Sequence, residues 1–464
     1  MRARGEARSR GRAARLPLAA LALAVLAVVP AAAQPPPAPG PAPGRPTGPL
    51  TPAPLVPEVL RPDPADTRPV QFRSFLRLEG EYDDNFFLSE TNKREVFREF
   101  LTPGVSLRLA RGRDSANLSY LPSLVHSSLD EGDLEVFHLF DGSGSLALTE
   151  RLTLNATDRF LRSDALALTD PRGIRRDRVI LTENTVAANL AYQQDVWSLV
   201  PRYGLTFNRN EGGDRERSIV HTAGVDGTRT ILERNTVGAG YEVTQGNFRL
   251  ADDFTGHTGR LTFARQLNPL TTADIAGVAT YRDVHRASDY YIYSADIGLR
   301  RDVSPRYTLE GRVGYNLTDV VAGGQDSEGV TFLLRGTYIG QTFRVVTTSL
   351  RSIQETFLER ENVGLTETTE STWELQYDVT RRLSLVLRAR VAQNEFLQLA
   401  GPTAAGTSED RKDLLLNGTL EVNFKLTRLL LLTVGYSYTN VDSNLRGFDY
   451  ENNQGRLSLS VVYP

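Results

Sequence analysis

The residues most able to perform chemistry form an acidic run near position 83. The stretch GEYDDNFFLSETNKREVF (residues 80–97) places two adjacent carboxylates, Asp83 and Asp84, beside the amide of Asn85. Such oxygen ligands could hold a hard cation, although their spacing is not that of an EF-hand. Paired carboxylates can also serve acid–base catalysis. A third interpretation is that the run marks a strand that leaves a membrane, and the surrounding elements must decide among the three.

Other catalytic or metal-binding patterns are weak. The histidines show no metal-ligand spacing such as His-Glu-x-x-His; they are His126, His138, His221, His257 and His285. His126 is followed by Ser127, Ser128 and Asp130, but serine is common at strand ends and the grouping is best read as coincidence. The chain has no cysteine, which excludes disulfides and thiolate chemistry. We therefore expect no catalytic residue, metal or cofactor, and a protein that is not an enzyme.

The amino terminus predicts export from the cytoplasm. Six arginines precede an apolar stretch at residues 16–29, and three alanines at 31–33 supply a small-residue cleavage site. We assign residues 1–33 to a secretory signal peptide, since an anchoring helix needs about 20 apolar residues. Residues 34–69 are proline-rich and predict an extended, disordered periplasmic tether. The net charge is −3, so the chain lacks the excess of Lys and Arg that nucleic-acid binding requires, and no nucleic-acid partner is expected.

Residues 70–464 repeat one pattern, in which runs of about ten residues alternate apolar and polar side chains. In YTLEGRVGYNL (residues 307–317), every second residue from Tyr307 to Leu317 is apolar or glycine. Short turns and longer polar loops alternate between the runs, as in outer-membrane barrels. The sequence thus predicts an all-β fold, a transmembrane antiparallel up-and-down β-barrel of roughly 18–20 strands. A two-sheet sandwich, a propeller or a β-helix would not alternate its connections in this way.

The alternation also assigns side chains to the two surfaces of the barrel. Polar positions should face the lumen, and the lumen-facing candidates are Arg77, Glu79, Glu81, Arg202, Glu242, Arg260, Arg300, Glu310, Arg312, Arg335, Arg388, Arg390, Glu421 and Lys425. Their mixed signs argue against strong ion selectivity. No loop looks long enough to fold inward as a constriction, and a β-bulge is expected near Asp141.

The first and last strands of a barrel pair with each other, which brings the two ends of the sequence together. The acidic run and the final loop should then be neighbours at the outer rim, where the candidates are Asp83, Asp84, Asn85, Asp449 and Glu451. We expect these residues to cap the loops and close the seam. Aromatic side chains near strand ends, such as Trp197 and Tyr463, should form interfacial belts.

Two short stretches carry a family resemblance. Tyr82-Asp83-Asp84-Asn85-Phe86 closes the first strand, and a loop with Ser443, Asn444, Asp449, Tyr450, Asn452 and Asn453 precedes the last. Both resemble the outer-membrane β-barrel porin family that includes the EpsL-like proteins of exopolysaccharide gene clusters. The terminal Pro464 departs from the usual terminal aromatic residue. The resemblance implies a channel in the Gram-negative outer membrane that is linked to polysaccharide secretion.

Two functions remain open from the sequence. One is a channel for export or passage of polysaccharide or other polar solutes. The alternative is a non-conducting structural or adhesive barrel whose extracellular loops are the working surface. The expected partners are outer-membrane lipid and lipopolysaccharide, the barrel-assembly machinery and, for the channel, periplasmic partners of polysaccharide export.

Overall fold

The computed structural model describes residues 68–129, 134–165, 178–211, 217–250, 252–285, 288–321, 326–357, 363–397 and 411–463. The predicted signal peptide and all but the last two residues of the predicted tether lie outside these residues. Among the described residues no helix is long and apolar enough to cross a membrane. Within these ranges, twenty strands form a single sheet.

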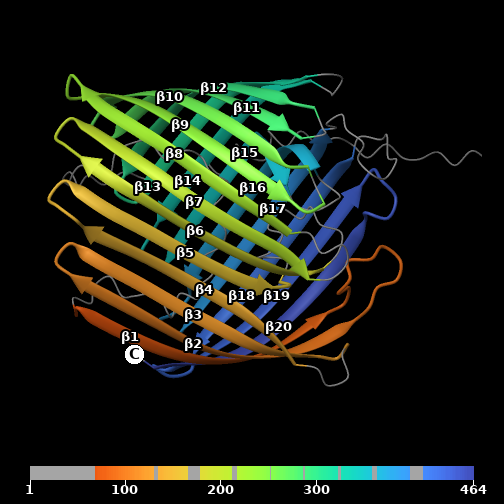
Figure 1. Cartoon of the computed structure of the whole chain (residues 1–464). Coiled ribbons are helices and arrows are strands. Elements are labelled where there is room, and N and C mark those ends of the chain that lie inside the picture. Colours follow the sequence, from red (N-terminus) through yellow and green to blue (C-terminus); the bar gives the residue numbers. More distant parts are fainter. Residues whose placement is uncertain are drawn as a thin grey trace, which may run out of the picture. The chain divides into compact units, whose positions relative to one another are not determined.

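The strands follow one another along the chain and begin at Val70 (Figure 1). The first ten are β1 Val70–Asp83, β2 Val96–Arg111, β3 Asp114–Ser127, β4 Leu134–Ala147, β5 Leu152–Ser163, β6 Ile180–Gln193, β7 Trp197–Glu211, β8 Arg217–Ile231, β9 Asn235–Phe248 and β10 Phe254–Asn268. The other ten are β11 Thr271–Val284, β12 Tyr290–Ser304, β13 Tyr307–Val320, β14 Ser327–Ile339, β15 Phe343–Phe357, β16 Val363–Asp378, β17 Leu383–Leu397, β18 Lys412–Lys425, β19 Leu430–Ser443 and β20 Tyr450–Tyr463.

Each strand pairs antiparallel with its neighbours in sequence, and the sheet closes on itself. The closing pair is β1 with β20, in a register that runs from Ser74 opposite Tyr463 to Asp83 opposite Gln454. Closure removes the two outer edges that an open sheet would have, as a lipid environment demands. The predicted closed antiparallel barrel, with its first and last strands paired, is confirmed.

The connections differ in length at the two ends of the barrel. One end carries tight turns such as 112–113 and 269–270, and both ends of the sheet-forming chain, Val70 and Tyr463, lie at that end. The other end carries longer connections such as 84–95 and 164–179. We refer to the two ends as the turn end and the loop end.

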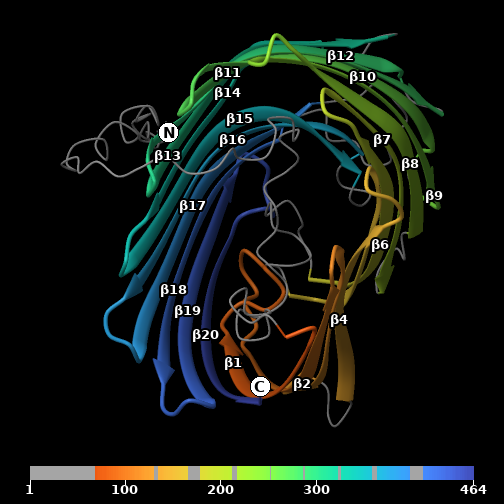
Figure 2. The ribbon, with the colours of Figure 1, turned by 90° about the vertical axis from the view of Figure 1, so that its left-hand side faces the viewer.

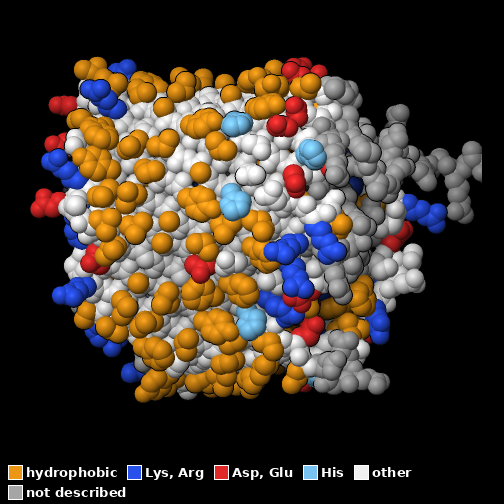
Figure 3. Space-filling view, in the orientation of Figure 1, with side chains coloured by type: hydrophobic (Ala, Val, Ile, Leu, Met, Phe, Trp, Pro, Cys, Tyr) orange, Lys and Arg blue, Asp and Glu red, His pale blue; other side chains and the backbone are white. Residues whose placement is uncertain are grey.

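The period-two pattern places apolar side chains on the outside of the barrel. Along β13, Leu309, Val313 and Leu317 alternate with polar residues, and Val313 is 56% exposed. Large apolar side chains cover much of the outer face (Figure 3). An exposed apolar surface of this extent would be unfavourable in water and is the surface that a bilayer covers.

Aromatic residues gather toward both ends of the strands. Tyr82, Tyr281 and Tyr438 lie toward the loop end, and Trp197 and Tyr463 lie at the turn end. Three histidines lie on the same outer face, toward the loop end. The Nδ1 atom of each forms a hydrogen bond with a tyrosine hydroxyl on a neighbouring strand. The pairs are Tyr120–His138 at 2.9 Å and Tyr203–His221 and Tyr241–His257 at 2.8 Å.

The predicted bulge near Asp141 is wrong. Strand β4 pairs with both neighbours without a register shift through this residue. Shifts occur instead between Gln266 and Asn268 and between Asp302 and Ser304, next to tight turns. Glycine stands at 142 and 144, but it is accommodated in a strand when its neighbours supply the contacts, and the Phe140 ring lies over Gly142.

Candidate functional site

The candidate site is the lumen of the barrel. All the charged residues that the sequence assigned to the lumen occupy strand positions opposite to the apolar outer face. Glu310 and Arg312, for example, alternate with Leu309 and Val313 on β13, and Glu242 follows the outward-facing Tyr241 on β9. Their placement on the inner face makes the lumen wall polar.

An arginine bridges two carboxylates on one side of the wall. Arg202 of β7 pairs with Asp226 of β8 and reaches Glu242 of β9, with a distance of 2.8 Å between Arg202 Nη2 and Glu242 Oε2. Arg260 of β10 occupies the next inward position in the series.

A second arginine, six strands further along the wall from Arg202, also bridges two carboxylates. Arg312 of β13 pairs with Asp296 of β12, and its Nη2 lies 2.7 Å from an oxygen of Asp274 on β11. The neighbouring inward positions hold Glu310 and Arg335, which lie directly opposite each other on β13 and β14. Opposite charges at adjacent inward positions therefore compensate one another along this wall.

The facing part of the wall is built in the same way. Arg388 of β17 lies 3.6 Å from Glu374 and 3.3 Å from Glu421, and Arg456 of β20 lies 3.1 Å from Glu421. Arg390 pairs with Glu370 at 2.7 Å. Sequence reasoning missed the partners of its candidates, which are Asp226, Asp274, Asp296, Glu370, Glu374 and Arg456. The alternation of each with apolar residues on its own strand could have identified them.

Inward-facing side chains become less exposed from the turn end to the loop end. Near the turns the Arg300 side chain is 63% exposed, and Lys425 is also exposed. Near the loops, the inward-facing Thr318, Thr366 and Asn394 are each 0% exposed. The lumen is thus accessible to water from the turn end and filled by protein at the loop end.

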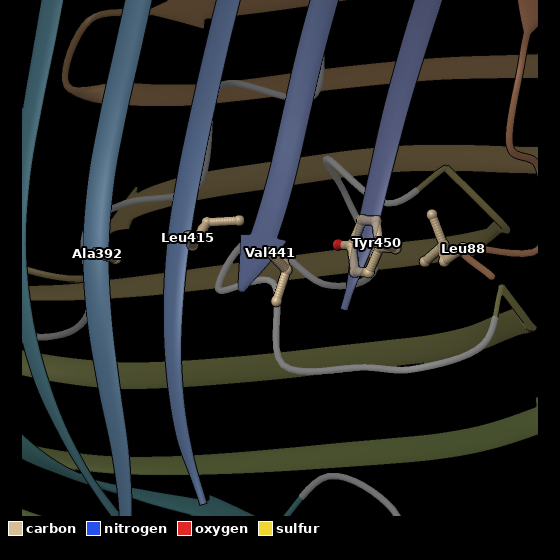
Figure 4. Close-up of a cluster of buried hydrophobic side chains, with 5 residues drawn as sticks. All are labelled: Leu88, Ala392, Leu415, Val441 and Tyr450. Atoms are coloured by element: carbon tan, nitrogen blue, oxygen red, sulfur yellow. The ribbon is translucent and has the colours of Figure 1, made fainter. Parts of the chain in front are cut away.

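One filling element is the connection between β1 and β2, residues 84–95, which lies inside the ring of strands (Figure 2). Leu88 packs in a buried cluster with Ala392, Leu415, Val441 and Tyr450, which face inward from β17 to β20 (Figure 4). The expectation that no loop folds inward is therefore wrong. The prediction considered only the length of the loops. A short loop can also fold into the lumen, because a few contacts hold it there when an apolar patch lies beside it.

The base of this connection is tied to the barrel seam by Asp83, which is fully buried. Its carboxylate accepts hydrogen bonds from Asn452 Nδ2, from Gln454 Nε2 at 2.8 Å and from the Asn85 backbone N–H at 3.0 Å. It also forms an ion pair with Arg178, with 2.6 Å between Nη2 and Oδ2. A carboxylate so fully occupied is a structural anchor.

A second group of buried ion pairs joins β1 and β2, the strands that flank this connection, to the connection between β5 and β6. Arg98 of β2 pairs with Glu81 at 2.5 Å and with Asp164 at 2.7 Å. The ring of Phe86 lies 5.0 Å from the Arg98 guanidinium and 4.2 Å from that of Arg178. Glu81, which the sequence placed among the lumen-lining charges, is therefore inward but enclosed by protein.

The remaining rim candidates also bind protein groups. Asp84 accepts hydrogen bonds of 2.7 Å from the backbone N–H and from Nδ2 of Asn453. Asp449 accepts from the Ser443 N–H at 2.6 Å, and Glu451 lies 3.3 Å from Lys93. Within the described ranges no histidine, aspartate and glutamate side chains group as metal ligands would. Asp84 and Glu451 thus join the first strand and its connection to the last strand, whereas Asp449 holds the connection between β19 and β20.

The hairpin of β15 and β16 closes the loop end from another side. Strand β15 pairs with β14 only from Arg344 to Arg351, so the loop-end part of β14, beginning at Ser327, is not paired with it. Beyond this point Glu355 reaches Arg282 of β11 with two contacts of 2.7 and 2.8 Å, and accepts a hydrogen bond of 3.0 Å from the hydroxyl of Tyr290.

These contacts mean that the hairpin end bends into the lumen. Glu355 and Leu365 continue the outward-facing series of β15 and β16, yet they meet the inward face of β10 to β13. Leu365 is buried there in a cluster with Phe254, Val284, Tyr290 and Val320. Strands β15 and β16 cross beneath β10 to β12 in the view along the barrel (Figure 2).

Comparison with known proteins agrees with this architecture. The family model described as "Putative beta-barrel porin 2" matches residues 338–463, which carry strands β15 to β20. The strand pairing makes the chain a closed β-barrel, and its residues 338–463 are similar to this family. No curated protein matches the chain.

Solved outer-membrane proteins show distant likenesses. OpdQ of Pseudomonas aeruginosa is 13% identical, with 86% of this chain and 99% of that chain covered and a TM-score of 0.41. OccK9 (OpdG) of the same organism is 12% identical, with coverage of 85% and 98% and a TM-score of 0.43. OccAB3 of Acinetobacter baumannii is 10% identical, with coverage of 84% and 99% and a TM-score of 0.39. The strand pairing, and not these likenesses, establishes the barrel.

Proposed function

We propose that the protein is an outer-membrane channel that passes polar solutes and serves the export or passage of polysaccharide. The observation that carries the proposal is a polar lumen, open to water at the turn end, inside a closed barrel with an apolar outer face. Such a wall offers hydrogen-bonding groups to a sugar hydroxyl while paired charges limit preference for either ion sign. The match to a porin family supports the same class.

In this proposal the turn end and the amino-terminal tether face the periplasm, and the loops face outward. The partners are outer-membrane lipid and lipopolysaccharide, the assembly machinery that inserts the barrel, and periplasmic components of polysaccharide export. The barrel performs no catalysis. The exopolysaccharide link rests on the sequence resemblance at residues 82–86 and 443–453, and the polar lumen is compatible with it.

A second function is favoured by one observation, which is the protein that fills the loop end. Two elements, residues 84–95 and the β15–β16 hairpin, occupy the lumen there. If they stay in place the barrel does not conduct, and its loops become the working surface of a structural or adhesive protein. If they move, they are the gate of the channel.

Single-channel conductance of the refolded mature chain in a planar bilayer separates the two functions. We expect discrete openings that oligosaccharides added at the turn end block reversibly. The same chain without residues 34–69 tests whether the tether contributes to gating. Silence from both forms, with folding shown by gel mobility, would reject the channel and favour the structural function.

A further inference from the structure

The barrel wall is split between β14 and β15 at the loop end. Strand β14 pairs with β13 along its length, down to Ser327. Its pairing with β15 stops at Phe332 opposite Arg351, although β15 continues to Phe357 in register with β16. Among the described residues, positions 327–331 of β14 therefore have no strand partner on this side. A lipid environment allows an open strand edge only where protein or water lies beside it.

Beyond the split, β15 lies inside β14 and not beside it. Gly329 of β14 alternates with the exposed Val330 and therefore belongs to the inner face of the wall. A Cβ at Gly329 would lie 3.4 Å from Nη2 of Arg351, which belongs to the outward-facing series of β15. The outer face of β15 thus lies against the inner face of β14, and Figure 2 shows the hairpin crossing beneath the neighbouring strands. The split leads into the space between two layers of strands.

The space between the two layers is apolar. Phe254, Val284, Tyr290 and Val320, named here the inner apolar patch, face it from β10 to β13, and Leu365 of the hairpin packs against them. This patch contrasts with the paired charges that line the lumen nearer the turn end. An apolar surface enclosed inside an otherwise polar lumen favours hydrocarbon over water.

The entrance to this space is polar. Arg351 forms an ion pair with Glu367 of β16, with 2.5 Å between Nε and Oε1, and 37% of the Arg351 side chain is exposed. Toward the turn end, Ser349 shares a hydrogen bond with Ser371. These residues belong to the outward-facing series of two strands, in a wall whose outer face is elsewhere largely apolar. A molecule that enters the split from the membrane therefore meets hydrogen-bonding groups first and the inner apolar patch behind them.

We propose that the split is a lateral portal between the lumen and the outer leaflet, and that it binds a glycolipid. The acyl chain lies between the two layers, against the inner apolar patch, and the sugar headgroup binds at Arg351 and Glu367. Charged side chains form stronger hydrogen bonds with sugar hydroxyls than neutral groups do, and burial of the acyl chain adds the hydrophobic contribution. The inference deepens the proposed function, on which it rests for the membrane orientation, by naming an amphiphilic form of the carbohydrate.

The test uses dodecyl maltoside that carries a diazirine in its alkyl chain, added as a minor component to phosphatidylcholine vesicles that contain the refolded mature chain. Photolysis attaches the alkyl chain to the residues that it touches, and mass spectrometry with fragmentation identifies them. We expect labelling at the inner apolar patch as well as on the lipid-facing outer wall. Labelling confined to the outer wall would overturn the proposal. Equal labelling of the patch by a phosphatidylcholine with the same diazirine would also overturn it, since no sugar headgroup would then be recognised.

The variant Gly329→Leu places a side chain in the split and should remove most of the labelling at the inner apolar patch, with the outer wall labelled as before. Gly418→Leu is the matched control, because a Cβ there meets no atom within 4 Å, and its labelling should equal that of the native chain. Glu355→Gln weakens the contact of the hairpin with Arg282 and should increase labelling of the patch about ten-fold. Gel mobility verifies that each variant is folded, and Glu355→Gln decides the outcome if Gly329→Leu does not fold. Unchanged labelling of the patch in the folded variants would contradict a portal at the split.

Conductance of the same native preparation separates this inference from the proposed function. Conductance without labelling of the inner apolar patch would leave the channel standing and overturn the lateral portal. Labelling of the patch in a barrel that stays silent would reject the channel and leave the glycolipid site between the two layers standing.

Discussion

At the scale of single residues, buried charges hold the seam between the first and last strands. Arg178 lies just outside the strands, and burial lowers the pKa of its guanidinium, as does the positive charge of Arg98, while the carboxylate of Asp83 acts in the opposite direction. The protein therefore keeps a charged group in an enclosed place only because Asp83 and its neighbours compensate it.

The variant Asp83→Asn should lower the stability of the folded barrel markedly. It removes the negative charge that pairs with the buried Arg178. It also places an amide N–H next to the side chains of Asn452, Gln454 and Arg178, which donate hydrogen bonds themselves. Breaking a buried pair in this way costs about 3–5 kcal/mol. The measurement is urea-induced unfolding in detergent micelles. Asp302→Asn, at the exposed turn end, is the control and should unfold as the native chain does.

The sequence predicted the acidic side of these buried ion pairs but not their arginine partners. Asp83 and Asn85 could be placed at the seam because a barrel must pair its first strand with its last. Arg178 could not, because it comes from a connection whose path no local pattern specifies. Arg98 belongs to the even-spaced inner series of β2, but its burial depends on Asp164, far along the chain, and periodicity carries no information about such a contact.

At the scale of elements, two inward-folded segments decide whether the lumen is open. The connection after β1 is held by the buried apolar side chains of Phe86 and Leu88, and the backbone φ of Leu88, 55°, is unfavourable for a leucine. The contacts of its side chain with the cluster on β17 to β20 offset that cost. The β15–β16 hairpin is held by Glu355 and Leu365 against β10 to β13.

The variant Leu88→Ala should release the connection from the wall and increase the open-channel conductance. Truncating a buried leucine costs about 2–5 kcal/mol, and the strained backbone then has no compensating contact. Phe87→Ala is the matched control, because Phe87 is the neighbouring residue and is exposed. Identical conductance in the two variants would show that the connection does not obstruct the solute path.

The variant Glu355→Gln should loosen the hairpin and raise the ratio of open to closed time. It weakens two charge-assisted hydrogen bonds with Arg282, each of a kind worth about 1.5–3 kcal/mol, so a change of about ten-fold or more is expected. Single-channel dwell times provide the measurement. Glu328→Gln on the outer face of β14 is the control, and an effect of equal size there would contradict a latch at Glu355.

The sequence specifies the strands better than it specifies their bending. Tyr307 and Leu317 of β13 were assigned to the outer face correctly, because lipid contact on every strand imposes the same alternation. The alternation of apolar and polar residues in β15 and β16 does not change where the hairpin turns inward. The sequence pattern therefore assigns Glu355 and Leu365 to the outer face. Only the loss of pairing with β14, which is a property of the sheet, reveals that their surroundings have changed.

At the scale of the whole molecule, closure of the twenty strands that the structure describes gives an apolar outer surface and a polar inner wall in which charges are paired across neighbouring strands. Arg202 and Arg312 each bridge two carboxylates, and Arg388 does the same on the facing wall. A wall of this kind has little net field along the lumen. An open barrel should therefore conduct both ions of a simple salt with weak preference.

The variant Arg202→Gln/Arg312→Gln tests whether this pairing sets the selectivity. It leaves Asp226, Glu242, Asp274 and Asp296 without their bridging cations, so the lumen gains negative charge and should favour cations. The reversal potential across a bilayer with a potassium chloride gradient should move toward the potassium equilibrium potential. Arg265→Gln/Arg301→Gln removes the same charge from the outer face and should leave the reversal potential in place. A shift of equal size in both double variants would mean that net charge, and not the paired wall, governs ion passage.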